Sequence, residues 1–367
     1  MKLNRIFCLL IVMLVYSTSI YSQKAEKQAL RVTYIQLPLT PLPDGIKSYT
    51  ARIHPGEMSF KFIHLNKPVA YVETGTSNNY GSIEKAEADF LLLPGYERLA
   101  SNGDLKIDVY LKKLTSKDKI MKTGTGQFAE DGKMLEKTYY YYEFDYSYYA
   151  AVVITGPSND TIYDKVFRNN VNKLAYYGQS TQEPREGFGS SYLSPQELEA
   201  SFQERFMLKQ EVEWTRESLL EIKQYLFNNL GMPLVYADFD IISGKGKLNY
   251  ADLDTAVVRM KKAFDEITLH KGDVVTAEQY LKDAITIWEK ALAESDPSNN
   301  KARINDDITA GLQYNIAVAN IWMRKLDSAK EWLKKASTIK YGERLARNVS
   351  ASIASYEKRW KANHLIE

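Results

Sequence analysis

Hydrophobic and polar residues alternate with a period of two over the first half of the chain. The segment 105–111 follows the turn pair Asn102-Gly103 and places Leu, Ile and Val at every second position. This alternation predicts a β-strand with one buried face. Shorter runs predict further strands at 32–35, 58–65 and 69–74, and the proline-rich stretch 37–45 ends the first of them. We therefore expect antiparallel strands, arranged as a β-sandwich or as a pair of small sheets.

The most aromatic predicted strand covers residues 137–155 and draws on a chain with 26 Tyr but only 13 Phe. Its even positions are aromatic from Tyr140 to Tyr148, which predicts a face packed into the core. Its odd positions mix tyrosines with carboxylates, which could stack on a sugar ring and accept its hydroxyl hydrogen bonds. The candidate glycan-binding residues are Tyr139, Tyr141, Glu143, Asp145 and Tyr149. An ordinary aromatic-rich strand explains the same residues, because tyrosine has a high β-propensity and stabilises sheets by cross-strand pairing.

The pattern becomes helical near residue 190. Ser194, Pro195 and Glu197 form a capping-box signature for a helix start, and Gly231 followed by Pro233 marks a helix end. Residues 232–242 are expected to be a short extended segment. Further helices are predicted at 250–268, 276–294, 304–324, 326–338 and 342–360.

Three of these helices repeat one spacing, in which two alanines flank a large residue at offsets of 4 and 7. The three sets are Ala256, Met260 and Ala263; Ala284, Trp288 and Ala291; and Ala329, Leu333 and Ala336. The spacing resembles the second helix of a tetratricopeptide repeat, and the resemblance covers about residues 276–340. The intervals between sets, 28 and 45 residues, depart from the family period of about 34. A generic helix bundle is the alternative. In the best repeat, the resemblance implies a concave partner-binding surface lined by Gln313, Asn320 and Arg324.

The first 22 residues have the order of a secretory signal peptide. Lys2 and Arg5 precede the apolar run 6–15, and a small polar stretch precedes Gln23. The run is too short to cross a hydrocarbon layer, which needs about 20 residues. Cys8, the only cysteine, lies inside it, so the mature chain is expected to have none. We therefore predict export without disulfides, to the periplasm or outside the cell.

The chain as a whole resembles exported Bacteroidota proteins of uncharacterised function that join an N-terminal β region to a repeat-like helical end. The residues that carry this resemblance are Tyr21-Ser22-Gln23, the segment 34–38 and the block 284–336. The expected fold class is α+β, with an antiparallel β-sandwich-like module followed by a tetratricopeptide-like helix array. The expected divisions are a signal peptide at 1–22, a β-rich domain at 23–190, linking helices and an extended segment at 191–249, and a helical domain at 250–367.

Charge and motifs narrow the function. Removing Lys2 and Arg5 lowers the 48 basic residues to 46, which balances the 46 acidic ones and argues against a nucleic-acid partner. The four histidines show no metal-ligand spacing, and no nucleophile elbow or phosphate loop occurs. Asp238 and Asp240 could share one face of an extended segment and hold a divalent cation, but no further ligands follow at loop spacing. We expect no metal and no cofactor.

The sequence therefore favours a non-enzymatic exported protein that binds another envelope protein through its helical module. The alternative is a glycan-binding protein that uses the tyrosine-rich strand. A third hypothesis is a hydrolase. For glycoside hydrolysis the candidate carboxylates are Glu143 and Asp145, because tyrosines surround them.

Overall fold

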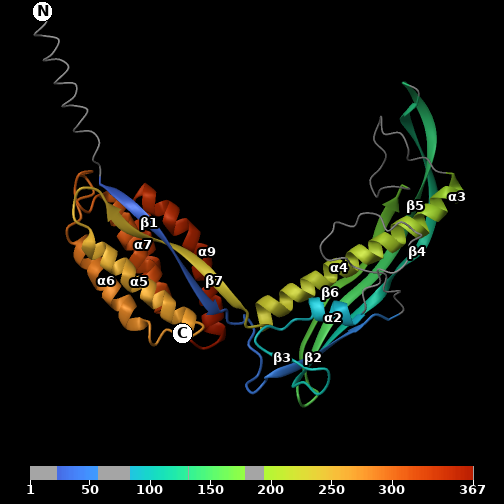
Figure 1. The fold of residues 1–367 in the computed structure, drawn as a ribbon. Helices are drawn as coiled ribbons and strands as arrows, with labels where there is room; N and C mark the ends of the chain where they lie inside the picture. The colour runs from blue at the N-terminus through green and yellow to red at the C-terminus, as the bar shows by residue number, and fades with distance from the viewer. Residues whose placement is uncertain (1–22, 57–82, 131, 178–193, 367) are drawn as a thin grey trace, which may run out of the picture. The chain divides into compact units, whose positions relative to one another are not determined.

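The computed structural model describes residues 23–56, 83–130, 132–177 and 194–366 (Figure 1). The chain forms two compact units. The sheet unit comprises residues 42–231, and the helical unit comprises the residues up to 41 together with those from 232 onward. The predicted signal peptide and the predicted strands at 58–65 and 69–74 lie outside the described residues.

The sheet unit is built on one five-stranded sheet. Its strands are β2 (Ser48–His54), β3 (Glu97–Arg98), β4 (Leu105–Glu130), β5 (Lys133–Thr155) and β6 (Thr161–Tyr176), in the order β3-β2-β4-β5-β6. β4, β5 and β6 pair antiparallel, while β2 lies parallel to β3 and β4. The strand predictions at 105–111 and 137–155 are confirmed.

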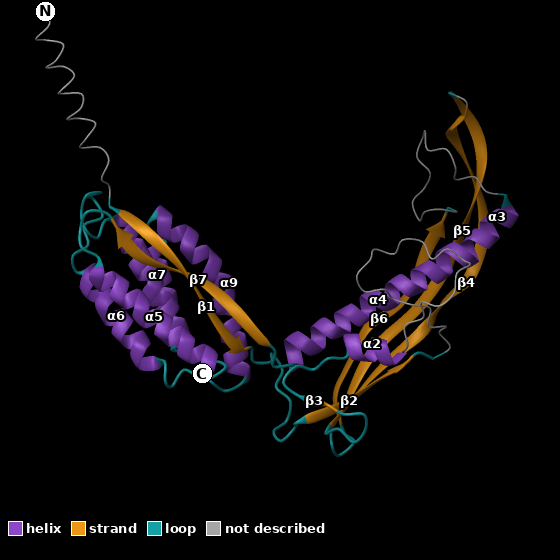
Figure 2. Cartoon of the chain, in the orientation of Figure 1, coloured by secondary structure: helices purple, strands orange, loops and turns teal. Residues whose placement is uncertain are grey.

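Helices cover one face of this sheet (Figure 2). They are α2 (Ile83–Phe90), α3 (Pro195–Ser201) and α4 (Leu208–Tyr225), with π-helical segments η1 (Phe202–Met207) and η2 (Leu226–Leu230). In the described part of the unit, helices therefore form the layer where the sequence predicts a second sheet. The capping box at Ser194 and Glu197 is confirmed, because each residue bonds the backbone N–H of the other.

The even face of β5 packs against these helices, as its aromatic pattern predicts. Tyr142, Phe144 and Tyr148 are buried. The rings of Phe144 and Phe202 meet edge to face, with their centroids 4.9 Å apart. The Tyr148 hydroxyl donates to Thr215 Oγ1 on α4 at 3.1 Å. The strand is aromatic because its rings fill the gap between the sheet and one long amphipathic helix.

The helical unit combines a two-stranded ribbon with five helices. β1 (Lys24–Ile35) pairs antiparallel with β7 (Leu234–Lys245). The helices are α5 (Ala251–Leu269), α6 (Glu278–Leu292), α7 (Asp306–Trp322), α8 (Leu326–Ala336) and α9 (Lys340–Ala362). All five lie within a few residues of the predicted ranges, and the extended segment predicted at 232–242 is β7. The alanine sets of α5, α6 and α8 are buried in the helix contacts.

The compact units do not follow the expected ranges 23–190, 191–249 and 250–367. β1 was expected in the β-rich domain, but its apolar residues Leu30 and Val32 share a core with Phe239 and helices α5–α9. Helix α4, expected in a linking region, buries its apolar stripe against the five-stranded sheet. Pairing of β1 with β7 moves the first strand to the helical unit, and the alternation of residues within β1 carries no information about that partner.

Candidate binding groove between β7 and α9

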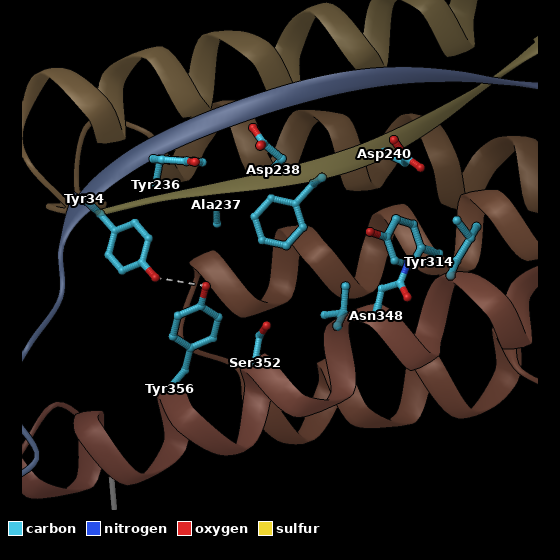
Figure 3. A pocket seen from close by; sticks show the side chains of 12 residues that line it. Tyr34, Tyr236, Ala237, Asp238, Asp240, Tyr314, Asn348, Ser352 and Tyr356 are labelled. Carbon is cyan, nitrogen blue, oxygen red and sulfur yellow. Dashed lines mark hydrogen bonds between the residues drawn. The ribbon is translucent and has the colours of Figure 1, made fainter. Parts of the chain in front are cut away.

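A cavity of about 430 Å³ lies in the helical unit between β7 and α9, a volume within the usual range of ligand pockets (Figure 3). Its lining comes from elements at both ends of the sequence, because β1, β7, α7 and α9 all contribute. We call it the β7–α9 groove. The lining residues are Tyr34, Tyr236, Ala237, Asp238, Phe239, Asp240, Tyr314, Leu345, Asn348, Val349, Ser352 and Tyr356.

The register of the ribbon determines which backbone groups of β7 face away from β1. The Gln36 N–H donates to the Pro233 carbonyl at 2.9 Å, so odd-numbered residues of β7 exchange hydrogen bonds with β1. The N–H and C=O groups of the even-numbered residues consequently point to the opposite edge. Among these, Tyr236, Asp238 and Asp240 line the groove.

At Ile242, the backbone groups on the outer edge of β7 form hydrogen bonds with the side chain of Asn315. The Ile242 N–H donates to Asn315 Oδ1 at 2.9 Å, and Asn315 Nδ2 donates to the Ile242 carbonyl at 2.7 Å. Asn315 is fully buried on α7 and so replaces a neighbouring strand at this one residue. Within the described residues, no comparable hydrogen bond reaches the outward backbone groups of Tyr236, Asp238 or Asp240. The groove therefore contains an unpaired strand edge.

The opposite edge of the ribbon is covered at the end of β1. The Thr33 N–H donates to Thr268 Oγ1 at 2.9 Å, and the Ile35 N–H donates to the Lys271 carbonyl at 2.9 Å. Both acceptors lie at the end of α5 or just after it. The two edges of the ribbon thus differ, since β1 is capped along its end whereas β7 is open beside α9.

Helix α9 is held in place by polar contacts with the segment that follows β1. Arg359 Nη1 donates to the Leu37 carbonyl at 2.5 Å, and Asn363 Nδ2 donates to the Pro38 carbonyl at 2.8 Å. Arg359 is 8% exposed, and its burial lowers the pKa of the guanidinium. These contacts fix the distance between α9 and the ribbon, and with it the width of the groove.

The two carboxylates of the groove belong to cross-strand ion pairs. Asp238 accepts from Arg31 Nε at 2.8 Å and from its Nη2 at 3.1 Å, which uses both carboxylate oxygens. The Arg31 hydrogen bond lowers the pKa of Asp238 below its usual value. Asp240 accepts from Lys27 Nζ at 2.6 Å through Oδ2. The Asp240 side chain is 41% exposed.

Tyrosine hydroxyls lie at both ends of the groove. At one end, the Tyr34 hydroxyl donates to that of Tyr356 at 3.2 Å, and burial raises the pKa of both groups (Figure 3). At the other end, Tyr314 is 3% exposed, yet its hydroxyl makes no hydrogen bond within the described structure. Burial, and then the negative charge of Asp240, raises the pKa of Tyr314 and keeps it protonated. The groove thus holds a neutral donor without a partner.

The predicted partner-binding residues do not lie together on an open concave surface. Asn320 is 6% exposed, and its amide donates to the Ile316 carbonyl on its own helix at 2.8 Å. Gln313 is half-buried, and Arg324 is a half-buried residue just after α7 with a left-handed backbone, φ 59°. Helix α7 packs against α6, α8, α9 and the ribbon, so the face expected to receive a partner is covered by the protein itself.

The predicted glycan residues lie on the face of the sheet opposite α4. Tyr141 stacks on Tyr177 at 4.9 Å, while Tyr139 is 5% exposed and lies against Gly124. Glu143 pairs with Lys122 at 2.6 Å, which lowers the pKa of its carboxyl.

Farther along the strand, Asp145 is half-buried, and Lys112 lies 5.0 Å from the centre of the Tyr149 ring. The structure therefore brings Tyr141, Glu143, Asp145 and Tyr149 to one face, but Tyr139 offers little surface to a ligand.

Sequence reasoning noticed Asp238 and Asp240 but not the groove. A polar residue at every second position of a strand indicates that one face is exposed. It does not indicate whether another strand pairs with either edge. Sequence reasoning also missed Asn348 and Ser352, and the signal that could have found them is their position one turn apart on α9, bordering the apolar stripe of Leu345 and Val349.

The comparisons with known proteins add no relative. No protein-family model matches the chain, and neither the curated proteins nor the solved structures contain a match. Across the described ranges, no cluster of three or more histidine, aspartate or glutamate side chains could hold a metal ion. In the same part of the chain, no helix combines the length and apolarity needed to span a membrane.

Proposed function

We propose that this chain is a non-enzymatic exported protein that binds another envelope protein through its helical unit. The observation that carries the proposal is the β7–α9 groove, which presents unpaired backbone groups of β7 beside apolar side chains of α9. Backbone hydrogen bonds to this strand edge would orient a ligand, and contact with the apolar side chains would add affinity. The tetratricopeptide-like arrangement of the helices stays part of the proposal, supported by the buried alanine sets of α5, α6 and α8.

The groove replaces the surface of Gln313, Asn320 and Arg324 as the proposed contact region. Leu345 and Val349, which are 2% and 4% exposed, form its apolar floor, and Asn348 and Ser352 form its polar rim. A narrow apolar floor with a polar rim is the usual composition of a protein-binding site.

Site-specific photo-crosslinking tests this proposal. A benzoylphenylalanine in place of Ser352 places the reactive group at the groove, whereas the same residue in place of Ala354 places it on an exposed, opposite side of α9. We expect ultraviolet light to produce a discrete protein adduct in native cell envelopes from position 352 and not from position 354. Equal adducts from the two positions, or no adduct from position 352, would refute the groove as the binding site.

A glycan-binding protein is the second candidate, supported by the half-buried ring stack of Tyr141 and Tyr177 beside Glu143 on the face opposite α4. Aromatic stacking with a neighbouring carboxylate is suited to a sugar ring. Titration of the mature protein with a polysaccharide panel, followed by tyrosine fluorescence, should show quenching that is absent in Tyr141→Ala. Identical titration curves for the two proteins would remove this candidate.

A further inference from the structure

The geometry of the groove points to one class of partner: we infer that β7 receives an extended peptide segment of the partner protein as a third strand of the ribbon. This inference rests on the proposed function and specifies what the groove binds. The outward N–H and C=O groups of Tyr236, Asp238 and Asp240 are spaced as one edge of a strand, over about 13 Å at 3.3 Å per residue. At Ile242 the Asn315 side chain already bonds the outward backbone groups of β7, and an added strand would bond the corresponding groups of the residues before it.

Three observations distinguish this edge from one that is protected against pairing. Natural edges are commonly blocked by unpaired charges, by bulges or by a covering element. Here, the pairing of β1 and β7 runs without a bulge, and both carboxylates are neutralised by basic residues of β1. The adjacent volume is a cavity rather than packed side chains.

The register also predicts the side-chain pattern of the added strand. Residues opposite Ala237 and Phe239 would point inward, toward the apolar floor formed by Leu345 and Val349. Residues opposite Asp238 and Asp240 would point outward. Because β1 already presents Arg31 and Lys27 to these carboxylates, a basic residue on the other side continues the alternation of charge across the strands. The partner segment therefore alternates apolar residues with Lys or Arg.

The unpaired Tyr314 hydroxyl lies beside this path, near Asp240 (Figure 3). It is buried, protonated and directed to the groove, so it is placed to donate to a carbonyl or side-chain oxygen of the incoming segment. A ligand oxygen at this position would supply the hydrogen-bond partner that the described residues do not give this hydroxyl.

A random-peptide selection against the mature protein tests the inference. Peptides that also bind the variant Ser352→Trp, in which the added ring fills the groove, are removed by counter-selection. The matched control is Ala354→Trp, which places the same ring on the exposed side of α9. We expect the enriched peptides to bind the mature protein and Ala354→Trp but not Ser352→Trp, and to alternate apolar and basic residues.

Backbone methylation then separates strand addition from other modes of binding. N-methyl groups on the alternate peptide residues that face β7 should weaken binding about tenfold for each hydrogen bond lost, whereas methyl groups on the remaining residues should have no effect. Amide hydrogen exchange at Asp238 and Asp240 should slow when the unmethylated peptide binds.

The outcomes separate the two proposals. Groove-dependent peptides with a helical period, or with equal sensitivity to both methylation sets, would overturn strand addition and leave the protein-binding groove intact. Failure to enrich any groove-dependent peptide would also overturn it. The proposed function fails independently, if crosslinking from position 352 does not exceed crosslinking from position 354.

Discussion

Replacement of Asn315 by alanine should destabilise the helical unit far more than the same replacement of Asn320. Both residues are asparagines of α7 and are 0% and 6% exposed, so cavity size and helix propensity are matched. They differ in what they bond. Asn315 satisfies the N–H and the C=O of the buried residue Ile242, whereas Asn320 adds a second donor to the Ile316 carbonyl, which α7 already serves.

The magnitude follows from the groups left without partners. A buried polar group deprived of its hydrogen bond costs about 1–3 kcal/mol, so exposure of both Ile242 groups to an apolar site costs about 2–6 kcal/mol. Asn320→Ala leaves no backbone group unpaired and should cost about 1 kcal/mol. The free energy of unfolding of a typical protein is about 5–15 kcal/mol, so Asn315→Ala should remove a large part of it and Asn320→Ala only a small part.

Urea unfolding followed by tryptophan fluorescence measures the difference, because four of the five tryptophans (Trp288, Trp322, Trp332 and Trp360) lie in the helical unit. We expect a lower midpoint at unchanged slope for Asn315→Ala and a midpoint near that of the unmodified protein for Asn320→Ala. Equal shifts in the two variants would refute the reasoning that Asn315 acts as a substitute strand for β7.

Four further predictions follow from particular contacts. Gly311→Ala on α7 should lower the melting temperature, because the added Cβ would lie 2.4 Å from Ile242 Cγ2 and overpacking costs about 1–3 kcal/mol; a higher melting temperature, the usual result of Gly→Ala in a helix, would contradict this. Glu211 is 7% exposed, and its burial raises the pKa of the carboxyl in the folded protein. The unfolded chain keeps the ordinary pKa, so the folded sheet unit loses stability as the pH rises from that value through the raised pKa. Glu211→Gln, which keeps an acceptor for the Leu114 N–H, should therefore have a higher urea midpoint than the unmodified protein at pH 7 and an equal one in acid; an advantage that persists in acid would argue against the titration. Arg31→Ala should return the pKa of Asp238 upward toward its ordinary value in an NMR titration, and an unchanged pKa would show that the ion pair does not form in solution. N-terminal sequencing of the protein from its native host should begin at Gln23, whereas a chain beginning at Met1 would contradict cleavage of the signal peptide.

The sequence predicted individual elements well where one amphipathic pattern had a single interpretation. Helices α5, α6, α8 and α9 each bury one apolar stripe, so their period was sufficient to place them, whereas α7 is buried on nearly all sides. β6 was missed because its sequence, TIYDKVFRNNVNKLAY, is interrupted by polar residues and shows no strict alternation. β2 was missed although Tyr49, Ala51 and Ile53 alternate with polar residues, because this alternation extends over only seven residues.

The candidate site was harder to predict, because its residues are far apart in sequence. The expected surface on α7 was derived from the first helix of a repeat, and it assumed that no other element covers that helix. In the fold, the ribbon and α9 both pack on α7, and Asn315, which the repeat pattern gave no special role, contacts β7. No local pattern distinguishes a polar residue that faces a partner from one that bonds the backbone of a distant strand.

The sequence by itself determined the five C-terminal helices and the strand patterns at 105–111 and 137–155, since these patterns depend on residues within a few positions of one another. Only the tertiary structure decided that β1 pairs with β7, a contact between residues 213 positions apart in the Lys27–Asp240 pair. That pairing leaves one edge of β7 open beside α9 and thereby creates the groove. The physical reason is that alternation fixes the two faces of a strand but not its two edges, which depend on the neighbours that the whole chain brings to them.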